Sequence, residues 1–246
     1  MSLFNLTVTR MLIPLTLLLP VAHAGNYQTF TSGGGRVTTI ELFTSEGCSS
    51  CPPADAWLSD LKNDPRLWKQ IVPLAFHVDY WDYIGWRDRF ASPENSARQK
   101  MHKNQGNIRS VYTPGFVLDG AEWRGWYRRG ALKLPQGDTI ELKLNVNGTE
   151  ITAAYAVATS DPLVLNVALL GFNLSSRISS GENSGRNLSH DFVVLEQKSV
   201  ISENGSWLLQ LPQIEQTPVT TKGIAAWISH PNSLKPLQAT GGWLTN

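Results

Sequence analysis

Hydrophobic positions between residues 36 and 134 alternate between short continuous runs and a helical stripe. Continuous apolar runs predict buried strands at Val37–Phe43, Ile71–Val78 and Phe116–Leu118. Over residues 54–61, apolar side chains recur at i, i+3, i+4 and i+7, which predicts an amphipathic helix. A second helix is expected from Ser92 to Asn104, because Ser is a favoured N-cap and Pro93 suits the first helical position. This order of strands and helices predicts an α/β domain over residues 36–134.

After residue 135 the pattern changes to short strand-like runs without a helical period. These runs are Thr139–Asn145, Glu150–Val157, Leu163–Phe172, Phe192–Val200, Trp207–Leu211, Gly223–Ser229 and Gln238–Trp243. Asn147-Gly148, between the first two runs, favours a tight hairpin turn. The succession of short strands predicts an all-β, sandwich-like domain over residues 135–246.

The N-terminal residues have the pattern of an export signal. Arg10 precedes the apolar run 11–21, which ends at the small-x-small triplet 22–24. This predicts a signal peptide over residues 1–24 and a periplasmic or secreted protein, with a retained signal-anchor as the alternative. The polar, Gly-rich residues 25–35 predict a flexible leader. No later segment has the length and apolarity of a membrane span, so none is expected after cleavage.

Composition narrows the classes of function. The 246 residues include 21 Lys and Arg and 20 Asp and Glu, and a net charge of +1 argues against a general nucleic-acid binder. With only 2 Cys, the chain is neither a disulfide-rich scaffold nor a four-thiolate zinc protein. Among the 9 Trp, four lie in polar, loop-like surroundings, and two of these are expected to be exposed. The four are Trp81, Trp86, Trp123 and Trp126.

The two cysteines form a CxxC motif, Cys48-Ser49-Ser50-Cys51, between a predicted strand and a predicted helix. The free N–H groups and positive dipole end of a helix N-terminus favour thiolate over thiol. Cys48 is therefore expected to be the outer, attacking thiol and Cys51 the resolving thiol, with Ser49 and Ser50 offering donors to sulfur. Because a residue before proline avoids the helical region, Pro52-Pro53 predicts that regular helix begins only at Pro53, further from Cys48.

Four segments carry a resemblance to a known family. They are Glu41–Asp55, which contains the CxxC motif, His77–Trp86, Val111–Pro114 and, together with the strand that follows it, Gly181–Gly185. Together they resemble a bacterial secreted, thioredoxin-like family of unassigned function (domain of unknown function 1223). The resemblance implies export and a thioredoxin fold, but no substrate. It also implies a cis bond between Thr113 and Pro114 beside the dithiol, where the backbone of these residues would pair with substrate.

Glu41, His77 and Asp79 are further candidates at this site. Glu41 is the acidic residue of the first predicted strand; if buried, it would have a raised pKa and accept the proton of Cys51. A surface-facing carboxylate is the alternative. His77 and Asp79 are expected to share a face at the end of the second strand, at the edge of the site. The alternative for these two is a hydrogen-bonded structural pair.

These patterns favour an exported, thioredoxin-like thiol–disulfide oxidoreductase. Its partner would be a thiol or disulfide of a protein or small molecule, and the exchange requires no organic cofactor and no metal. A non-catalytic binding module with a structural Cys48–Cys51 disulfide is a second reading. The third is a copper or zinc carrier that uses both thiols and His77. The direction of redox chemistry and the oligomeric state stay open.

Overall fold

The computed structural model describes residues 27–128, 132–156, 161–216 and 218–245. The expected signal peptide, residues 1–24, lies outside the described residues. Among the described residues, no helix combines the length and apolarity needed to cross a membrane.

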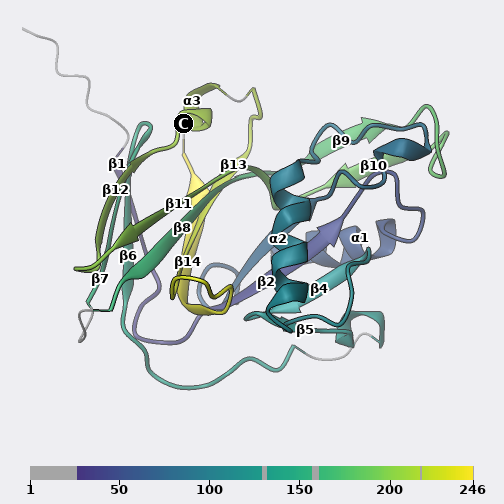
Figure 1. The fold of residues 1–246 in the computed structure, drawn as a ribbon. Helices are drawn as coiled ribbons and strands as arrows, with labels where there is room; N and C mark the ends of the chain where they lie inside the picture. Colours follow the sequence, from purple (N-terminus) through teal and green to yellow (C-terminus); the bar gives the residue numbers. More distant parts are fainter. Residues whose placement is uncertain (1–26, 129–131, 157–160, 217, 246) are drawn as a thin grey trace, which may run out of the picture.

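A mixed central sheet runs through most of the molecule (Figure 1). Its strand order is β14 (Pro236–Leu244), β13 (Lys222–Ser229), β8 (Leu163–Gly171), β11 (Val193–Ser202), β3 (Ile71–His77), β2 (Thr38–Thr44), β4 (Gly115–Leu118) and β5 (Ala121–Glu122). Strands β2 and β3 are parallel, and β4 pairs antiparallel with β2. The strands expected between residues 36 and 134 are therefore confirmed, with ends shifted by one residue or so.

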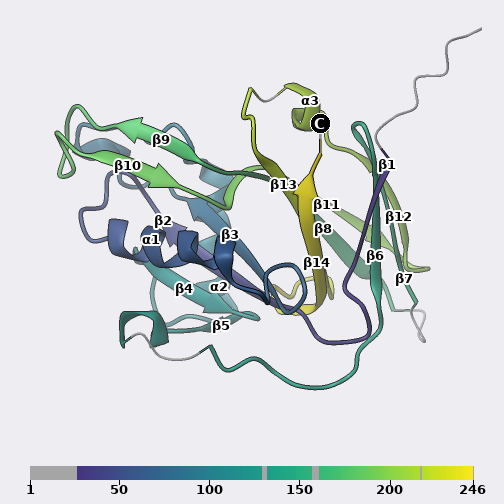
Figure 2. The ribbon, with the colours of Figure 1, turned by 180° about the vertical axis from the view of Figure 1, so that it is seen from behind.

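Helices α1 (Pro52–Asp60) and α2 (Pro93–Asn104) lie on opposite faces of the β3–β2–β4 part of this sheet, as opposite views show (Figures 1 and 2). The start of α2 confirms the cap expected from the sequence, because Ser92 Oγ accepts a hydrogen bond from the Asn95 N–H at 3.2 Å. Short 3-10 helices occupy Leu61–Asn63, Asp82–Ile84 and Gly125–Arg128. In the later half, α3 (Gln213–Gln216) is a single turn.

The central sheet joins the two halves of the chain. Strand β3 pairs in parallel with β11 at Ala75 and Val193, and the Ala75 N–H donates to the Phe192 carbonyl at 2.8 Å. Strand β11 in turn pairs antiparallel with β8. Residues 36–134 and 135–246, which were expected to form consecutive domains, thus contribute strands to one sheet.

A second, antiparallel sheet has the order β1 (Tyr27–Thr31), β6 (Leu142–Asn147), β7 (Glu150–Tyr155) and β12 (Ser206–Gln210). Strand β1 corrects the expectation of a flexible leader over residues 25–35. Its backbone pairs in register with β6, and its side chains alternate between half-buried and exposed. Polar composition hid this strand because its edge position requires few apolar residues.

The outer sheet packs on the β13–β8 part of the central sheet. Strand β8 directs Leu165, Val167 and Leu169 into the core between these sheets, and Ala168 and Leu170 into the other core, on the opposite face of the strand. All seven strands expected after residue 135 are present in this arrangement. The later half is therefore sheet-rich as expected, although its strands do not form a separate sandwich.

Strands β9 (Leu174–Arg177) and β10 (Asn187–His190) form a hairpin that the sequence pattern did not indicate. Their short segments, LSSR and NLSH, lack the apolar content of the other strands. The hairpin lies beside α1, at the end of the molecule away from the outer sheet (Figure 2). This position places it over the CxxC loop.

Candidate functional site

The CxxC motif lies where β2 leads into α1, and its two sulfurs form a disulfide. The Cα atoms of Cys48 and Cys51 are 5.4 Å apart. Regular helix begins at Pro52, so the expected start at Pro53 is wrong. Cys51 itself has helical φ and ψ of −77° and −36°, and its carbonyl accepts hydrogen bonds from the Ala54 and Asp55 N–H groups at 2.8 and 3.1 Å. The disulfide therefore sits directly at the N-terminal end of α1.

Both sulfur-bearing residues are buried. Cys48 is 1% exposed and Cys51 is 0% exposed, which corrects the expectation of an outer, solvent-facing Cys48. Ser49 and Ser50 between them are exposed. Of these two, Ser50 reaches the sulfur, with its Oγ 3.4 Å from Cys48 Sγ.

The turn between β9 and β10 covers the CxxC loop. Asn183, which is 1% exposed, donates from Nδ2 to the carbonyls of Glu46 and Cys48 at 2.8 and 3.0 Å. Glu182 accepts a hydrogen bond from the Ser49 N–H at 3.3 Å. The sequence could not place this cover, because Asn183 lies 135 positions after Cys48.

Thr113 and Pro114 lie beside the CxxC loop, and the bond between them is cis, which confirms the expectation from the resemblance. They line a cavity of about 530 Å³ together with Ser50, so the structure brings these three residues together. Other lining residues are Ser110, Tyr112, Arg124, Trp126, Tyr127 and Arg128. We call this the Ser50 cavity.

Aromatic side chains surround this region, but not as expected. Trp81, Trp86, Trp123 and Trp126 are all half-buried, so the prediction that two of them are exposed is wrong. Trp81 donates from Nε1 to Thr113 Oγ1 at 2.7 Å, which ties it to the loop it packs against. The exposed aromatic rings are tyrosines instead, with Tyr83 81% and Tyr127 80% exposed.

Glu41 is buried, but its pKa moves in the opposite direction from the expected one. Burial alone would raise this pKa, yet the carboxylate accepts two hydrogen bonds of 2.7 Å from Arg98 and lies 3.2 Å from His102 Nε2. These charges lower its pKa to about 2. A carboxylate held in this way is a very weak base, so Glu41 is poorly suited to accept the proton of Cys51.

His77 is fully buried and paired with Asp88 rather than with Asp79. Its Nδ1 lies 2.7 Å from Asp88 Oδ2. Burial opposes the charged imidazolium, but the Asp88 carboxylate outweighs it and raises the pKa of His77, while the pKa of Asp88 is lowered. Asp79 is bound to α2 instead, where it accepts a hydrogen bond from the Ser96 hydroxyl.

A second buried histidine, His190 of β10, lies next to this pair. The rings of His77 and His190 are 4.8 Å apart, and His190 Nε2 lies 3.2 Å from Glu46 Oε1 without hydrogen-bond geometry. Asp55, in the first turn of α1, is also buried. Sequence reasoning assigned no role to His190, Glu46 or Asp55. Glu46 and Asp55 lie in a segment that carried the family resemblance, whereas nothing marked His190.

No cluster of three or more His, Cys, Asp or Glu side chains in the described parts of the chain could hold a metal ion. His77 is engaged with Asp88, and the two sulfurs are bonded to each other. The geometry of these residues therefore gives no support to the copper or zinc carrier.

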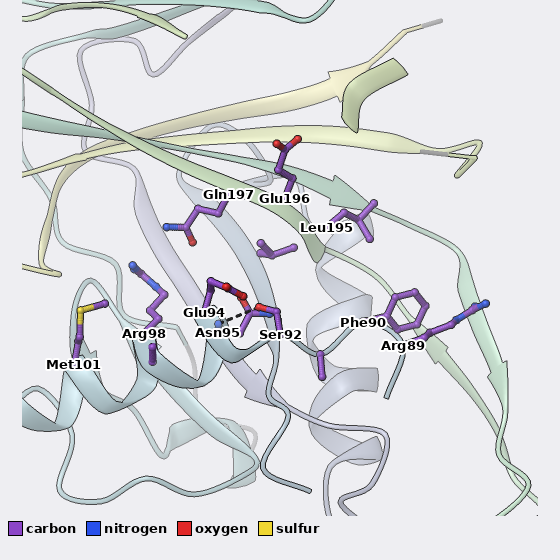
Figure 3. A pocket seen from close by; sticks show the side chains of 13 residues that line it. Arg89, Phe90, Ser92, Glu94, Asn95, Arg98, Met101, Leu195, Glu196 and Gln197 are labelled. Atoms are coloured by element: carbon purple, nitrogen blue, oxygen red, sulfur yellow. Dashed lines mark hydrogen bonds between the residues drawn. The ribbon is translucent and has the colours of Figure 1, made fainter. Parts of the chain in front are cut away.

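Another cavity, of about 590 Å³, lies between α2 and β11. Arg98 and Glu94 of α2 line it opposite Glu196 and Gln197 of β11 (Figure 3). Arg98 is already committed to Glu41. None of the lining residues comes from the CxxC loop or from Thr113-Pro114, so this cavity is separate from the dithiol site.

Solved structures of known proteins resemble this fold, and a family model matches the sequence. A crystal structure of protein AGR_C_4864 from Agrobacterium tumefaciens matches with a TM-score of 0.60 and 26% identity, over 85% of this chain and 94% of that one. HBP35 of Porphyromonas gingivalis matches in fold, with a TM-score of 0.54 and 15% identity, over 87% of this chain and 76% of that one. No curated protein matches. The model of the family described as "protein of unknown function (DUF1223)" matches residues 39–229, and the chain therefore belongs to this family.

Proposed function

We propose that this protein is an exported thiol–disulfide oxidoreductase that works in the periplasm or outside the cell. The observation that carries the proposal is the position of Ser50, which contacts Cys48 Sγ at 3.4 Å and lines a cavity with Thr113 and Pro114. On this proposal, β2, α1, β3, α2 and β4 act as a thioredoxin-like unit around the disulfide.

The exchange uses the start of α1 to stabilise a leaving sulfur. A substrate thiolate attacks Cys48 Sγ; a bond forms between these two sulfurs, and the Cys48–Cys51 bond breaks. Cys51 leaves as a thiolate at the positive end of the α1 dipole, which lowers the cost of its charge, although Pro52 and Pro53 at the start of this helix have no N–H to donate. A second substrate thiolate then attacks the substrate sulfur of the mixed disulfide, and Cys48 leaves as a thiolate. The substrate is thereby oxidised to a disulfide and the protein becomes a dithiol. The reverse sequence reduces a substrate disulfide.

The Ser50 cavity gives the substrate a place to bind. Tyr112 and Trp126 offer apolar surface, and Arg124 and Arg128 add positive charge. Tyr127 is 80% exposed at the same cavity, where a ring can stack on a partner at small entropic cost. A peptide or small thiol bound here would approach Cys48 across Ser50.

Access to Cys48 requires the turn that carries Asn183 to move. The cover over the loop depends on polar contacts from Asn183 and Glu182, and such contacts contribute only about 1 kcal/mol each. An opening of this kind therefore costs much less than unfolding the protein. The protein would then react in its open state and protect the disulfide in its closed state.

The burial of Cys48 also favours a second candidate function. A disulfide at 1% exposure suits a permanent clip that holds the start of α1 in a binding module without redox chemistry. In that case the loss of either cysteine would mainly lower stability, typically by about 2–5 kcal/mol.

Trapping a mixed disulfide distinguishes the two functions. Cys51→Ser leaves Cys48 without its resolving partner, so incubation of the folded variant with glutathione disulfide is expected to add one glutathione, detected by intact mass. Cys48→Ser is the matched control, and its Cys51 is expected to react much more slowly, because Ser50 of the cavity contacts Cys48 Sγ. If neither folded variant reacts while both react in urea, the disulfide is a structural clip and the oxidoreductase proposal is wrong.

A further inference from the structure

Asp55 lies one helical turn after the resolving cysteine, in a buried part of the site. It follows Cys51 by four positions, and Cys51 already has helical φ and ψ. Side chains four positions apart on a helix are neighbours, with Cβ atoms about 5–6 Å apart. Asp55 is only 7% exposed and Cys51 is 0% exposed, so both groups on this side of the helix start lie largely out of water.

Asp55 has no strong cation beside it. No Lys or Arg forms an ion pair with Asp55 within the described ranges. Burial raises the pKa of Asp55, and His190 and His77 offset this only in part. The contrast with Glu41 is direct, because Arg98 and His102 hold that carboxylate in its charged form.

Charged and polar groups face Asp55 from several elements. The histidines come from β10 and β3, and the Thr44 hydroxyl comes from β2. The negative charge of Asp88 raises the pKa of Asp55 further, although Asp88 is itself bound to His77. Glu46, Arg186, Asp60 and Asp191 complete the charged side chains around this region.

A cavity connects Asp55 to the outside. Its volume is about 370 Å³, and it lies between α1 and β10, lined by Asp55, His190, Arg186 and Pro52 among others. Water in this cavity can give a proton to Asp55 or take one from it. The buried Cys51 thus has a route for protons that does not pass through the covered front of the loop.

We infer that Asp55 is the proton acceptor and donor for Cys51 during exchange, an inference that rests on the proposed oxidoreductase function. When the protein is oxidised, the Cys51 thiol gives its proton to the Asp55 carboxylate and the resulting thiolate attacks Cys48 Sγ in the mixed disulfide. The Cys48–Cys51 bond forms, the bond from Cys48 to the substrate breaks, and the substrate sulfur leaves as a thiolate. Asp55 then releases the proton to water in its cavity. In the reverse direction, protonated Asp55 supplies the proton to the leaving Cys51.

Asp55→Asn tests this role, and Asp161→Asn is the matched control because Asp161 is exposed and does not line this cavity. The reduced proteins are mixed with glutathione disulfide, quenched with acid, and analysed by mass for the mixed disulfide and for the closed Cys48–Cys51 bond. Asp55→Asn is expected to form the mixed disulfide within about twofold of the unmodified rate, but to close it at least about tenfold more slowly at pH 6. The difference should shrink at pH 9, since a thiol with a pKa near 8.5 ionises there without help. Asp161→Asn should match the unmodified protein at both pH values.

Equal closure rates in Asp55→Asn and the unmodified protein at pH 6 would overturn the role of Asp55 while leaving the oxidoreductase intact. A failure of the unmodified protein to form either the mixed disulfide or the closed Cys48–Cys51 bond would overturn both. Should Asp55→Asn fail to fold, the pH profile of the unmodified protein decides. With Asp55 as acceptor, closure stays fast well below pH 8, whereas an unassisted thiol would slow about tenfold for each pH unit from pH 8 to pH 5.

Discussion

At the scale of single residues, the buried carboxylates have different tasks because they have different neighbours. Glu41 is held by Arg98 and His102 and has a pKa of about 2, so it is a structural anion. Asp55 has a raised pKa and lines a cavity, so it can gain and lose a proton. The neighbours of each carboxylate therefore decide whether it stays charged or can exchange a proton.

Glu41→Gln is expected to lower the free energy of unfolding by about 3–5 kcal/mol, because Arg98 would remain buried without its partner. Urea denaturation at pH 7 measures this change. Glu94→Gln on α2 is the control; its carboxylate is exposed, and it should cost no more than about 1 kcal/mol. A loss as small as that of Glu94→Gln would show that the Glu41–Arg98 pair contributes little.

The same pair predicts a dependence of stability on pH. The pKa of Glu41 is lowered from 4.5 to about 2, so its contribution is complete above pH 4.5 and is lost as the pH falls toward 2. This group alone should remove about 3 kcal/mol from the free energy of unfolding across that window. The decline should be smaller in Glu41→Gln. An equal decline in both proteins would assign acid sensitivity to other groups.

Local sequence was enough to place Cys48 and Cys51, because the strand, the CxxC loop and the helix follow one another directly, whereas the position of Thr113-Pro114 was expected from the family resemblance. It was not enough for Glu41 or His77. The partner that sets the pKa of Glu41, Arg98, is 57 positions away, and sequence spacing gives no information on such a contact. Glu41 was therefore expected to act as a base, because the sequence does not show that Arg98 lowers its pKa.

At the scale of elements, the β9–β10 hairpin decides whether the disulfide can be reached. Its turn holds the carbonyls of Glu46 and Cys48 through Asn183 and buries the sulfur behind the loop. The hairpin escaped prediction because its strands are short and polar and are stabilised by pairing with each other. The element that the sequence showed least clearly is thus the one that sets access.

Asn183→Ala is expected to speed the reduction of the disulfide by dithiothreitol by about fivefold or more. The loss of two buried hydrogen bonds favours the open turn by about 1–2 kcal/mol, which corresponds to a factor of about 5–30 in population. Timed alkylation of released thiols measures the rate. Ser184→Ala in the same turn is the control, since its side chain is exposed. Equal reduction rates in Asn183→Ala and Ser184→Ala would mean that this turn does not limit access.

At the scale of the whole molecule, one sheet holds both halves of the chain together. Strand β11 from the later half lies between β3 and β8. The strands next to the disulfide and the strands that pack against the outer sheet therefore belong to one continuous sheet. Periodicity predicted nearly all of these strands but not their order, because the β3–β11 pairing joins residues more than a hundred positions apart. Because the sequence does not show the β3–β11 pairing, the change of pattern near residue 135 was interpreted as a domain boundary.

The shared sheet predicts a single cooperative unfolding transition. Circular dichroism follows the strands of both halves, whereas tryptophan fluorescence is weighted toward Trp57, Trp68, Trp81, Trp86, Trp123 and Trp126 in the first half. Coincident curves in urea are expected. Two separated transitions would show that the halves fold independently despite their common sheet.

Whether Cys48 and Cys51 exchange with a partner is decided most directly by their equilibrium with glutathione. The folded protein is incubated in buffers of defined ratios of reduced to oxidised glutathione, trapped with an alkylating reagent, and analysed by mass. An exchangeable pair is expected to have a midpoint potential above about −300 mV, within reach of cellular thiols. A midpoint well below about −300 mV would identify a permanent clip and contradict the proposed function.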